Sequence, residues 1–226
     1  MPKVNITVEI NNKVYLKDPL STSLGQSMIK EAIILFEEVG YENLNFKKLA
    51  TRMHSSEASL YRYFENKYKL LTYLVAWYWD FMHYMVLMDI RNIADPKERL
   101  KVSINTLVNS LDSTATPDYI NQNKLHIIVV ENASKVYHTK DVDKLSEEGY
   151  YQNFGKLVTT LSEIITEIDK NFKYPRTFAT NIIEQSLSSE YYLRHLPMLT
   201  DKPTKKFDAR VETIKMINYM LDKMLN

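Results

Sequence analysis

Apolar residues recur every three or four positions along most of this chain, and this spacing constrains the fold more than any other feature. It is clearest near the two ends, at Met28, Ala32, Leu35, Phe36 and Val39 and at Ile214, Ile217, Met220, Leu221 and Met224. Such spacing places apolar side chains on one face of a helix. Only four of the 226 residues are glycine, fewer than parallel strands and phosphate-binding turns generally need. We therefore expect an all-α protein.

Capping residues divide the chain into nine predicted helices. Ser23 with Gln26 predicts a capping box, Gly40 a left-handed helix end, and Asn45 and Asn66 predict further N-caps. Ser55 or Ser56 can cap the third helix. The predicted helices span about 23–40, 46–53, 57–64, 67–90, 96–111, 116–137, 143–170, 175–196 and 205–225.

Residues 4–16 show a different pattern. Val4, Ile6, Val8 and Ile10 alternate with polar residues, and Asn11-Asn12 can occupy a tight turn. This pattern predicts a short β-hairpin that docks on the body or on a second subunit. The alternative is a frayed N-terminal arm.

Composition excludes several classes of site. The chain has no cysteine, so disulfides, thiolate metal sites and cysteine nucleophiles are ruled out. The five histidines are scattered without metal-ligand spacing, and no nucleophile motif is present. We expect no enzyme activity, cofactor or metal. With no apolar run of about 18 residues and no signal peptide pattern, we expect a cytoplasmic protein that does not enter a membrane.

Basic residues are concentrated in one short segment although the net charge is only +1. Between Phe46 and Leu71 there are two acidic residues, Glu57 and Glu65, and six basic ones: Lys47, Lys48, Arg52, Arg62, Lys67 and Lys69. Three short helices followed by a long one, with basic residues on the second, the third and the start of the fourth, indicate a helix-turn-helix in which the third helix enters the DNA major groove. The alternative is an ordinary solvated face.

The segment offers candidates for DNA contact. Arg62 can bind guanine with two hydrogen bonds, and Tyr61 and Tyr63 flank it as phosphate donors. Lys67 lies at the start of a helix, where charge and free amides favour a phosphate. Leu60 and Phe64 are predicted to face inward. The candidate DNA-binding residues are Lys47, Ser55, Ser56, Glu57, Ala58, Ser59, Tyr61, Arg62 and Lys67.

Residues 24–71 resemble the DNA-binding domain of the TetR family of transcriptional regulators. The resemblance rests on Leu49-Ala50, on the run from Ser59 to Lys67 (SLYRYFENK) and on Leu70-Leu71. It implies that Tyr61 and Lys67 touch phosphates and that residues from Ser55 to Ser59, with Arg62, read bases or position the helix. The chain departs from the family at His54, where glycine with a positive φ is usual, at Ser55 and at Glu57.

The resemblance also implies a ligand cavity among the middle helices and a dimer interface on the last two helices. Aromatic and polar residues make Trp77, Phe81, His126, Tyr151 and Phe154 the ligand-binding candidates, with ordinary packing as the alternative. The candidate dimer residues are Ile183, Leu187, Tyr191, Ile214, Ile217 and Leu221, for which intramolecular packing is the alternative.

These patterns predict three segments: an arm over 1–22, a helix-turn-helix domain over 23–71 and a helical regulatory and dimerisation domain over 72–226. The predicted function is that of a DNA-binding transcriptional regulator, a repressor, that binds a palindromic operator as a homodimer. A small-molecule effector, unidentified from sequence, would release it. The alternative is a helical ligand-binding or scaffold protein of TetR-like fold with weak or lost DNA binding.

Overall fold

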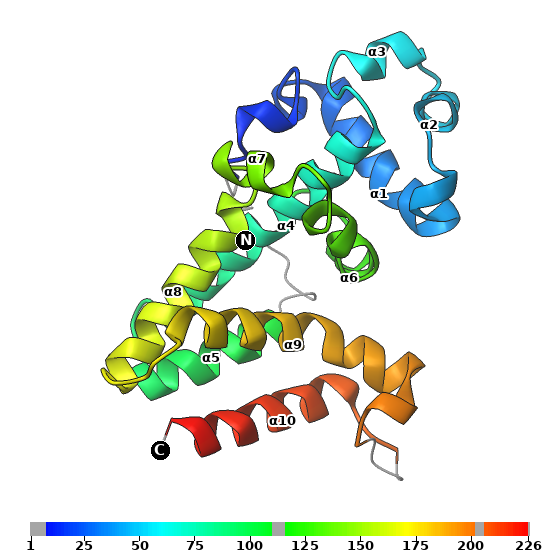
Figure 1. Ribbon diagram of the computed structural model, residues 1–226. Coiled ribbons are helices and arrows are strands. Elements are labelled where there is room, and N and C mark those ends of the chain that lie inside the picture. The colour runs from blue at the N-terminus through cyan, green and yellow to red at the C-terminus, as the bar shows by residue number, and fades with distance from the viewer. Residues whose placement is uncertain (1–7, 110–115, 202–205, 226) are drawn as a thin grey trace. The chain divides into compact units, whose positions relative to one another are not determined.

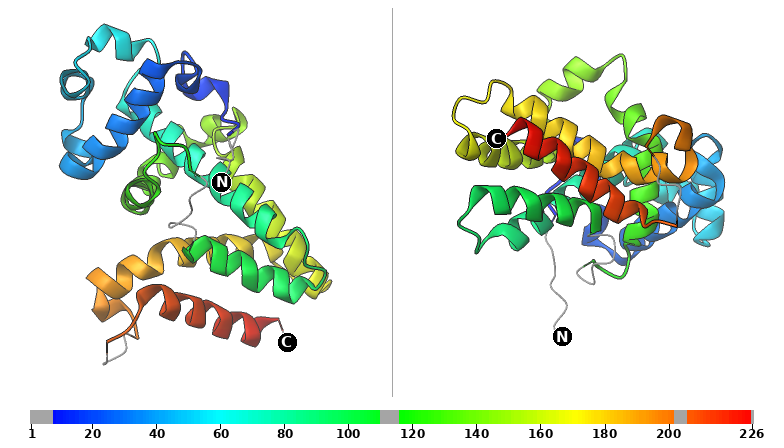
Figure 2. Two further views of the ribbon diagram at one scale, coloured as in Figure 1. Left: turned by 180° about the vertical axis from the view of Figure 1, so that it is seen from behind. Right: turned by 90° about the horizontal axis from the view of Figure 1, so that it is seen from below.

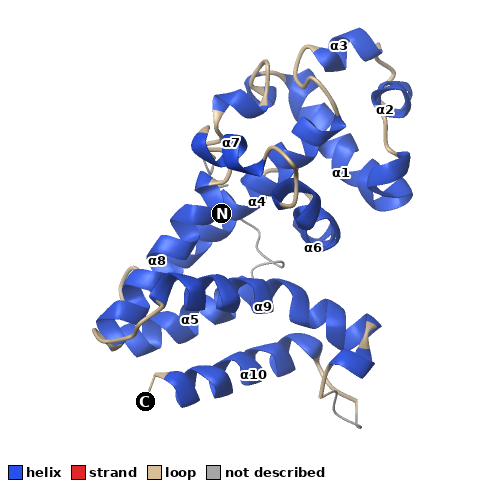
Figure 3. Ribbon diagram, viewed as in Figure 1, coloured by secondary structure: helices blue, strands red, loops and turns tan. Residues whose placement is uncertain are grey.

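The computed structural model describes residues 8–109, 116–201 and 206–225, and this part of the chain is helical, with no strand (Figure 3). Its α-helices are α1 (Ser23–Asn43), α2 (Phe46–Arg52), α3 (Glu57–Tyr61), α4 (Lys67–Ile90), α5 (Pro96–Asn109), α6 (Gln122–Tyr137), α7 (Val142–Glu147), α8 (Gln152–Ile168), α9 (Pro175–His195) and α10 (Ala209–Met224) (Figure 1). Short 3-10 turns lie at Asn12–Val14, Pro19–Ser21 and Pro197–Leu199. The all-α prediction is confirmed.

The chain forms two compact units. The first contains residues 1–81 and 112–154, and the second contains residues 82–111 and 155–226. The first unit therefore holds α1, α2, α3, α6 and α7 with most of α4. The second holds α5, α9 and α10 with most of α8 and the end of α4.

The first unit is built around the N-terminal part of α4, which is apolar on all sides. Trp77 and Phe81 are fully buried, and their rings stack with centroids 5.3 Å apart. Helix α6 packs against α1. Two ion pairs join these helices, one between Lys124 and Glu37 and one of 3.8 Å between Lys135 and Glu42. Helix α6 is thus attached directly to the first helix of the predicted DNA-binding domain.

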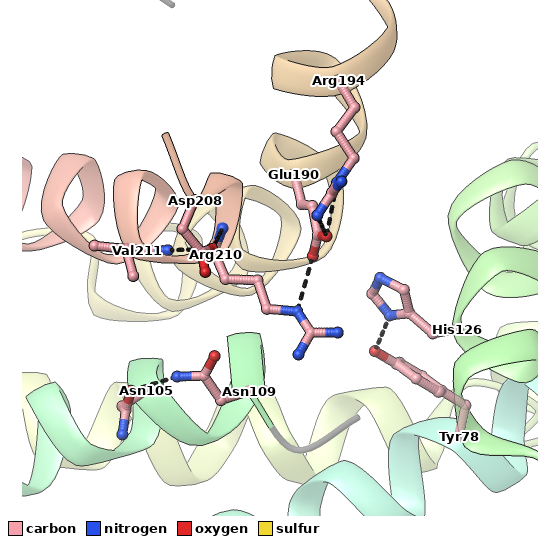
Figure 4. Close-up of polar contacts among 9 residues, drawn as sticks. All are labelled: Tyr78, Asn105, Asn109, His126, Glu190, Arg194, Asp208, Arg210 and Val211. Atoms are coloured by element: carbon pink, nitrogen blue, oxygen red, sulfur yellow. Dashed lines mark hydrogen bonds and ion pairs between the residues drawn. The ribbon is translucent and has the colours of Figure 1, made fainter. Parts of the chain in front are cut away.

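In the second unit, α5, α9 and α10 lie side by side (Figure 2). Their shared core includes Ile104 from α5, Ile183 from α9 and Ile217 from α10, each at most 2% exposed. Glu190 on α9 accepts from Arg194 on the same helix and from Arg210 on α10, at 2.8 and 3.4 Å (Figure 4). Burial of apolar faces, supported by this ion pair, holds the last two helices together.

Several predicted helix ends are confirmed. Asn45, Ser56 and Asn66 accept hydrogen bonds from the backbone amides of Lys48, Ser59 and Lys69, so each caps the helix that follows it. Asp95 does the same for α5. Gly40 has φ 72°, and the helical conformation of α1 is interrupted there.

Other predictions were wrong at the level of local structure. Residues 8–16 form no strand but include a 3-10 turn at Asn12–Val14, while Val4 and Ile6 lie outside the described residues. The capping residue of α1 is Thr22, which accepts from the Gly25 amide, instead of Ser23. The side chain of Gln26 turns back to the Leu20 carbonyl, so the predicted capping box does not form.

Several predicted helices differ in extent; α3, for example, ends at Tyr61 and not at Phe64. The helix predicted over 143–170 is divided into α7 and α8 at Gly149, which has φ 82° and so leaves the helical region. The helix predicted to begin at Thr116 begins at Gln122, capped by Asn121, because Pro117 and Ile120 close a separate turn. Residues 110–115 lie outside the described residues, and with them the last two positions of the helix predicted over 96–111.

Candidate nucleic-acid interface

Helices α2 and α3 are joined by a turn that depends on one strained residue. His54 has φ 49°, and it is the one non-glycine residue with positive φ in the described ranges. The amide of Ser55 then donates to the Ala50 carbonyl at 2.9 Å, and Ser56 caps α3. The expectation that the position of His54 takes a positive φ is confirmed. It is unusual for a residue with a Cβ.

The rear of the recognition helix α3 is anchored in the core. Leu60 and Phe64 are fully buried, as predicted, and Phe64 packs edge-on against Tyr73 with ring centroids 5.3 Å apart. Tyr63 is also buried, and its hydroxyl hydrogen-bonds Thr22 at 2.7 Å. The interpretation of Tyr63 as a phosphate donor is therefore corrected, since its hydroxyl is used inside the protein.

The opposite side of α3 is open to solvent. Ser56, Glu57, Ala58, Tyr61 and Arg62 are exposed, whereas Ser55 and Ser59 are partly buried. The Tyr61 ring rests on Phe46 of α2, with centroids 4.9 Å apart, while the side chain is 48% exposed. Its ring is thus fixed by packing, which suits a hydroxyl that must donate in a defined direction.

Most of the six basic side chains of this segment are bound within the protein. Arg52 pairs with Glu31 at 2.7 Å and with Glu38 at 2.6 Å, and these hydrogen bonds, that to Glu31 first, raise its pKa. Lys48 donates to the Asn43 carbonyl. Lys69 donates to the Lys13 carbonyl and to the Tyr150 hydroxyl.

Lys47 and Arg62 remain unpaired. Both are exposed, and neither side chain makes a hydrogen bond or ion pair within the described part of the chain. Because exposed, unpaired cations can exchange solvent and counterions for phosphate or base contacts, these two residues are the free positive charges beside the exposed side of α3.

Lys67 is partly engaged. Its ammonium donates to the carbonyls of Tyr41 and Glu42 at 2.9 and 3.0 Å and lies 4.5 Å from the centre of the Tyr41 ring. An ammonium has three N–H donors, so one remains for a phosphate. The side chain is also held in place by the end of α1, an arrangement that sequence alone did not reveal.

The candidate ligand residues fall into three groups in the first unit. Trp77 stacks on Phe81, both fully buried. Phe154 stacks on Trp79 at 4.6 Å, and Tyr151 meets Tyr137 edge-on at 5.4 Å.

His126 forms the third group with Tyr78. Its Nδ1 lies 2.9 Å from the hydroxyl of Tyr78, whose pKa is raised by burial (Figure 4). Because that hydroxyl stays protonated, it can donate to Nδ1.

The sequence analysis missed the residues that connect Phe154 with Tyr151. The indole of Trp79 donates to the Tyr137 hydroxyl at 2.7 Å, and Tyr137 also contacts the Phe154 ring. Burial raises the pKa of Tyr151 to about 12, and its hydroxyl donates to the Val136 carbonyl. Trp79, Tyr137 and Phe154 belong to three different helices, and a pattern search within one helix cannot bring them together.

The candidate dimer residues are mostly in the core of the second unit. Ile183, Leu187, Ile217 and Leu221 are at most 6% exposed, and Ile214 is partly buried. Tyr191 is 36% exposed. Other apolar side chains of α9, the 3-10 turn after it and α10 are more open: Tyr192, Met198, Leu199, Val211, Met216, Tyr219, Met220 and Met224.

Comparison with known proteins agrees with this geometry. Residues 28–74 match the family described as bacterial regulatory proteins, tetR family. This segment of the chain, which contains α2 and α3, is therefore similar to the DNA-binding domain of that family. No curated protein sequence matches the chain.

Solved structures extend the TetR-like fold over most of the chain. AibR in complex with isovaleryl coenzyme A and operator DNA has a TM-score of 0.59 at 18% identity, covering 86% of this chain and 96% of that one. A putative TetR-family transcriptional regulator from Syntrophomonas wolfei gives 0.63 at 18%, covering 88% and 93%. The fatty acid degradation regulator FadR from Bacillus halodurans gives 0.58 at 17%, covering 86% and 92%.

The described residues contain neither a candidate metal site nor a helix that could span a membrane. No group of three histidine, aspartate or glutamate side chains there is arranged to hold a metal ion. No helix within the same ranges has the length and hydropathy to cross a membrane.

Proposed function

We propose that this protein is a transcriptional repressor that binds a palindromic operator as a homodimer and is released by a small molecule. The observation that carries the proposal is the two-sided recognition helix. Leu60 and Phe64 fix its rear in the core, while Tyr61 and Arg62 are exposed on its outer side. A rigid helix with a free polar side is what the major groove accepts.

Specific roles follow for the residues of this interface. Arg62 would bind a guanine, Tyr61 and Lys67 would each donate to a phosphate, and Lys47 would add positive charge. Ser55, Ser56, Ala58 and Ser59 are small enough to let the helix approach the bases. Glu57 would accept from a cytosine amine and repel phosphate elsewhere.

The domain roles are part of the same proposal. Residues 23–71 would read DNA, and residues 72–226 would bind effector and partner. Apolar side chains exposed on α10, such as Tyr219 at 65% and Met224 at 51%, support a second copy as the partner of the last two helices.

For the effector we propose an acyl-coenzyme A thioester. AibR was solved with isovaleryl coenzyme A, and FadR is named for fatty acid degradation. Tyr151, Phe154 and His126 are partly exposed and would provide apolar surface and polar groups for such a ligand. Trp77 and Phe81 are fully buried, so a ligand would reach them only after neighbouring side chains move.

The test begins with selection of binding sequences from a random duplex library by the full-length chain. We expect a palindrome, and addition of isovaleryl coenzyme A should weaken binding to it. A chain that enriches no duplex sequence would instead be the ligand-binding or scaffold protein considered above, and an acyl-coenzyme A without effect would remove the effector class.

Arg62→Ala should reduce affinity for the selected operator by about 1–3 kcal/mol and relax the preference at one base position. The matched control is Lys170→Ala, which removes an exposed cation from the segment after α8. Equal losses for the two variants would show that Arg62 supplies only bulk charge.

A further inference from the structure

A segment outside the helix-turn-helix is bound to the end of the recognition helix. The amide of Leu16 donates to the Tyr63 carbonyl at 2.8 Å, and the Lys17 ammonium lies 5.6 Å from the centre of the Tyr63 ring. Tyr63 follows Arg62 directly, and its own amide donates to the Leu60 carbonyl. Residues 9–17, which we call the N-terminal strap, therefore contact the turn that directly follows α3.

The other end of the N-terminal strap is bound to the connection between α7 and α8. The side-chain amide of Asn11 donates to the Glu148 carbonyl at 2.7 Å, and that of Asn153 donates to the Glu9 carbonyl at 2.7 Å. The Tyr150 hydroxyl donates to the Lys13 carbonyl at 2.8 Å. The strap lies beside α7 in Figure 1, and both are parts of the first unit.

The middle of the N-terminal strap is stiff. Val14 is 1% exposed, and Tyr15 meets Tyr73 of α4 edge-on at 6.1 Å. Asn11 also accepts from the Lys13 amide and so caps the 3-10 turn. A segment anchored at both ends and at its centre has few conformations of its own, so a displacement at one end is passed to the other.

A glycine permits the contact with α7 and α8. Gly149 has φ 82°, and a Cβ placed on it would lie 3.1 Å from the side-chain nitrogen of Asn11. The backbone of the α7–α8 connection thus approaches the strap as closely as a residue without a side chain allows.

We propose that the N-terminal strap couples the α7–α8 connection to the recognition helix, so that a change at Glu148 alters the stability of the turn containing Tyr63. The inference rests on the proposed function for its biological meaning, because only a DNA-reading α3 makes such coupling regulatory. The coupling itself is a property of the protein without DNA.

The test perturbs one end of the strap and measures the other by amide hydrogen exchange in the full-length chain without DNA or ligand. Asn11→Asp keeps the oxygen that caps the 3-10 turn but removes the donor to Glu148. Asn12→Asp is the control, with the same charge change on an exposed neighbour. We expect Asn11→Asp to speed exchange at the Tyr63 and Phe64 amides about fivefold, the size of one lost hydrogen bond, and Asn12→Asp to leave it unchanged.

A second pair of variants tests whether the effect of Asn11→Asp reaches Tyr63 through the N-terminal strap. Leu16→Pro deletes the amide that reaches Tyr63, and Tyr15, at φ −133° and ψ 158°, has the extended backbone that proline requires before it. Leu16→Ala removes the same exposed side chain and keeps the amide. The effect of Asn11→Asp at Tyr63 should persist with Leu16→Ala and disappear with Leu16→Pro.

Either of two results would overturn the proposal: equal exchange in Asn11→Asp and Asn12→Asp, or an Asn11→Asp effect that survives Leu16→Pro. If Leu16→Pro does not fold, the comparison of Asn11→Asp with Asn12→Asp still decides. The exchange measurements use no DNA. If the protein failed to bind any duplex, the proposed function would be refuted, but the coupling measured by hydrogen exchange would still stand.

Discussion

At the scale of single residues, the cations of the candidate interface differ in how far they are engaged within the protein. Lys67 holds the carbonyls of Tyr41 and Glu42 and has one donor left, whereas Arg62 is unpaired among the described residues. Residue type alone would treat the two cations alike. Under the proposed function, Arg62 would act on DNA only, whereas Lys67 would also stabilise the end of α1.

Lys67→Ala should therefore have two effects. The slope of log affinity against log salt should become shallower by about one unit, since one phosphate contact is lost for every sequence tested. Thermal unfolding should also shift to lower temperature, because two carbonyls lose their donor. Operator titrations at several salt concentrations measure the first effect, and an unchanged slope would argue against a phosphate contact.

The positive φ of His54 should lower the stability of the folded protein by an amount that can be measured. Its φ of 49° lies where a Cβ is crowded, and no hydrogen bond of its side chain is found in the described structure. His54→Gly should give a protein more stable than His54→Ala by about 1 kcal/mol, because alanine keeps the crowded Cβ. Urea unfolding of both variants provides the comparison. If the alanine variant were the more stable, the turn would be unstrained.

At the scale of elements, the N-terminal part of α1 depends on a close approach. A Cβ on Gly25 would lie 2.2 Å from the Pro19 carbonyl oxygen, so the 3-10 turn at Pro19–Ser21 sits directly on α1. Gly155 in α8, by contrast, has no neighbour within 4 Å of such a Cβ. The same substitution should act in opposite directions at the two sites.

We expect Gly25→Ala to lower the free energy of unfolding by about 1–3 kcal/mol through overpacking. Gly155→Ala should raise it by about 0.5–1 kcal/mol, because alanine favours a helix and meets no obstacle. Calorimetry on both variants tests the pair. A destabilised Gly155→Ala would mean that this face of α8 is covered in the assembled protein.

The same elements show what the sequence could and could not predict. The helices were predictable from periodicity and capping residues, and Asn45 and Asn66 marked true helix starts. The alternation from Val8 to Ile10 misled because its partners are distant residues such as Asn153 and Asp80, which no local pattern contains. The buried side of the candidate interface was predictable from Leu60 and Phe64. The pairing of Arg52 was not, because its partners Glu31 and Glu38 lie on a different helix, α1.

At the scale of the whole molecule, the last helix exposes several large apolar side chains. Tyr219 is 65% exposed and Met224 51%, while Ile217 and Leu221 on another side of α10 are buried. A dimer interface that buries Tyr219 and Met224 would leave Ile217 and Leu221 in the core of each chain. The best interface candidates are therefore the exposed side chains of α10, with Tyr191 as the one exposed member of the set predicted from sequence.

If the proposed homodimer forms through α10, Tyr219→Glu should leave the protein monomeric and abolish cooperative operator binding, because a buried unpaired carboxylate opposes association. Lys170→Glu, an equally exposed site outside α9 and α10, is the control and should remain dimeric. Sedimentation equilibrium gives the mass of each. A dimeric Tyr219→Glu would place the interface elsewhere.

The attachment of α6 to α1 has a practical consequence for measuring DNA affinity. The pair between Lys124 and Glu37 has side chains 31% and 33% exposed, and that between Lys135 and Glu42 is more open still. Added salt screens such pairs within a Debye length of about 10 Å at 0.1 M. Added salt should therefore weaken the attachment of α6 to α1 at the same time as it reduces the free energy that a bound protein gains by releasing counterions from the duplex. A phosphate count taken from one salt titration would be too large, and only the difference between two variants would isolate the phosphates.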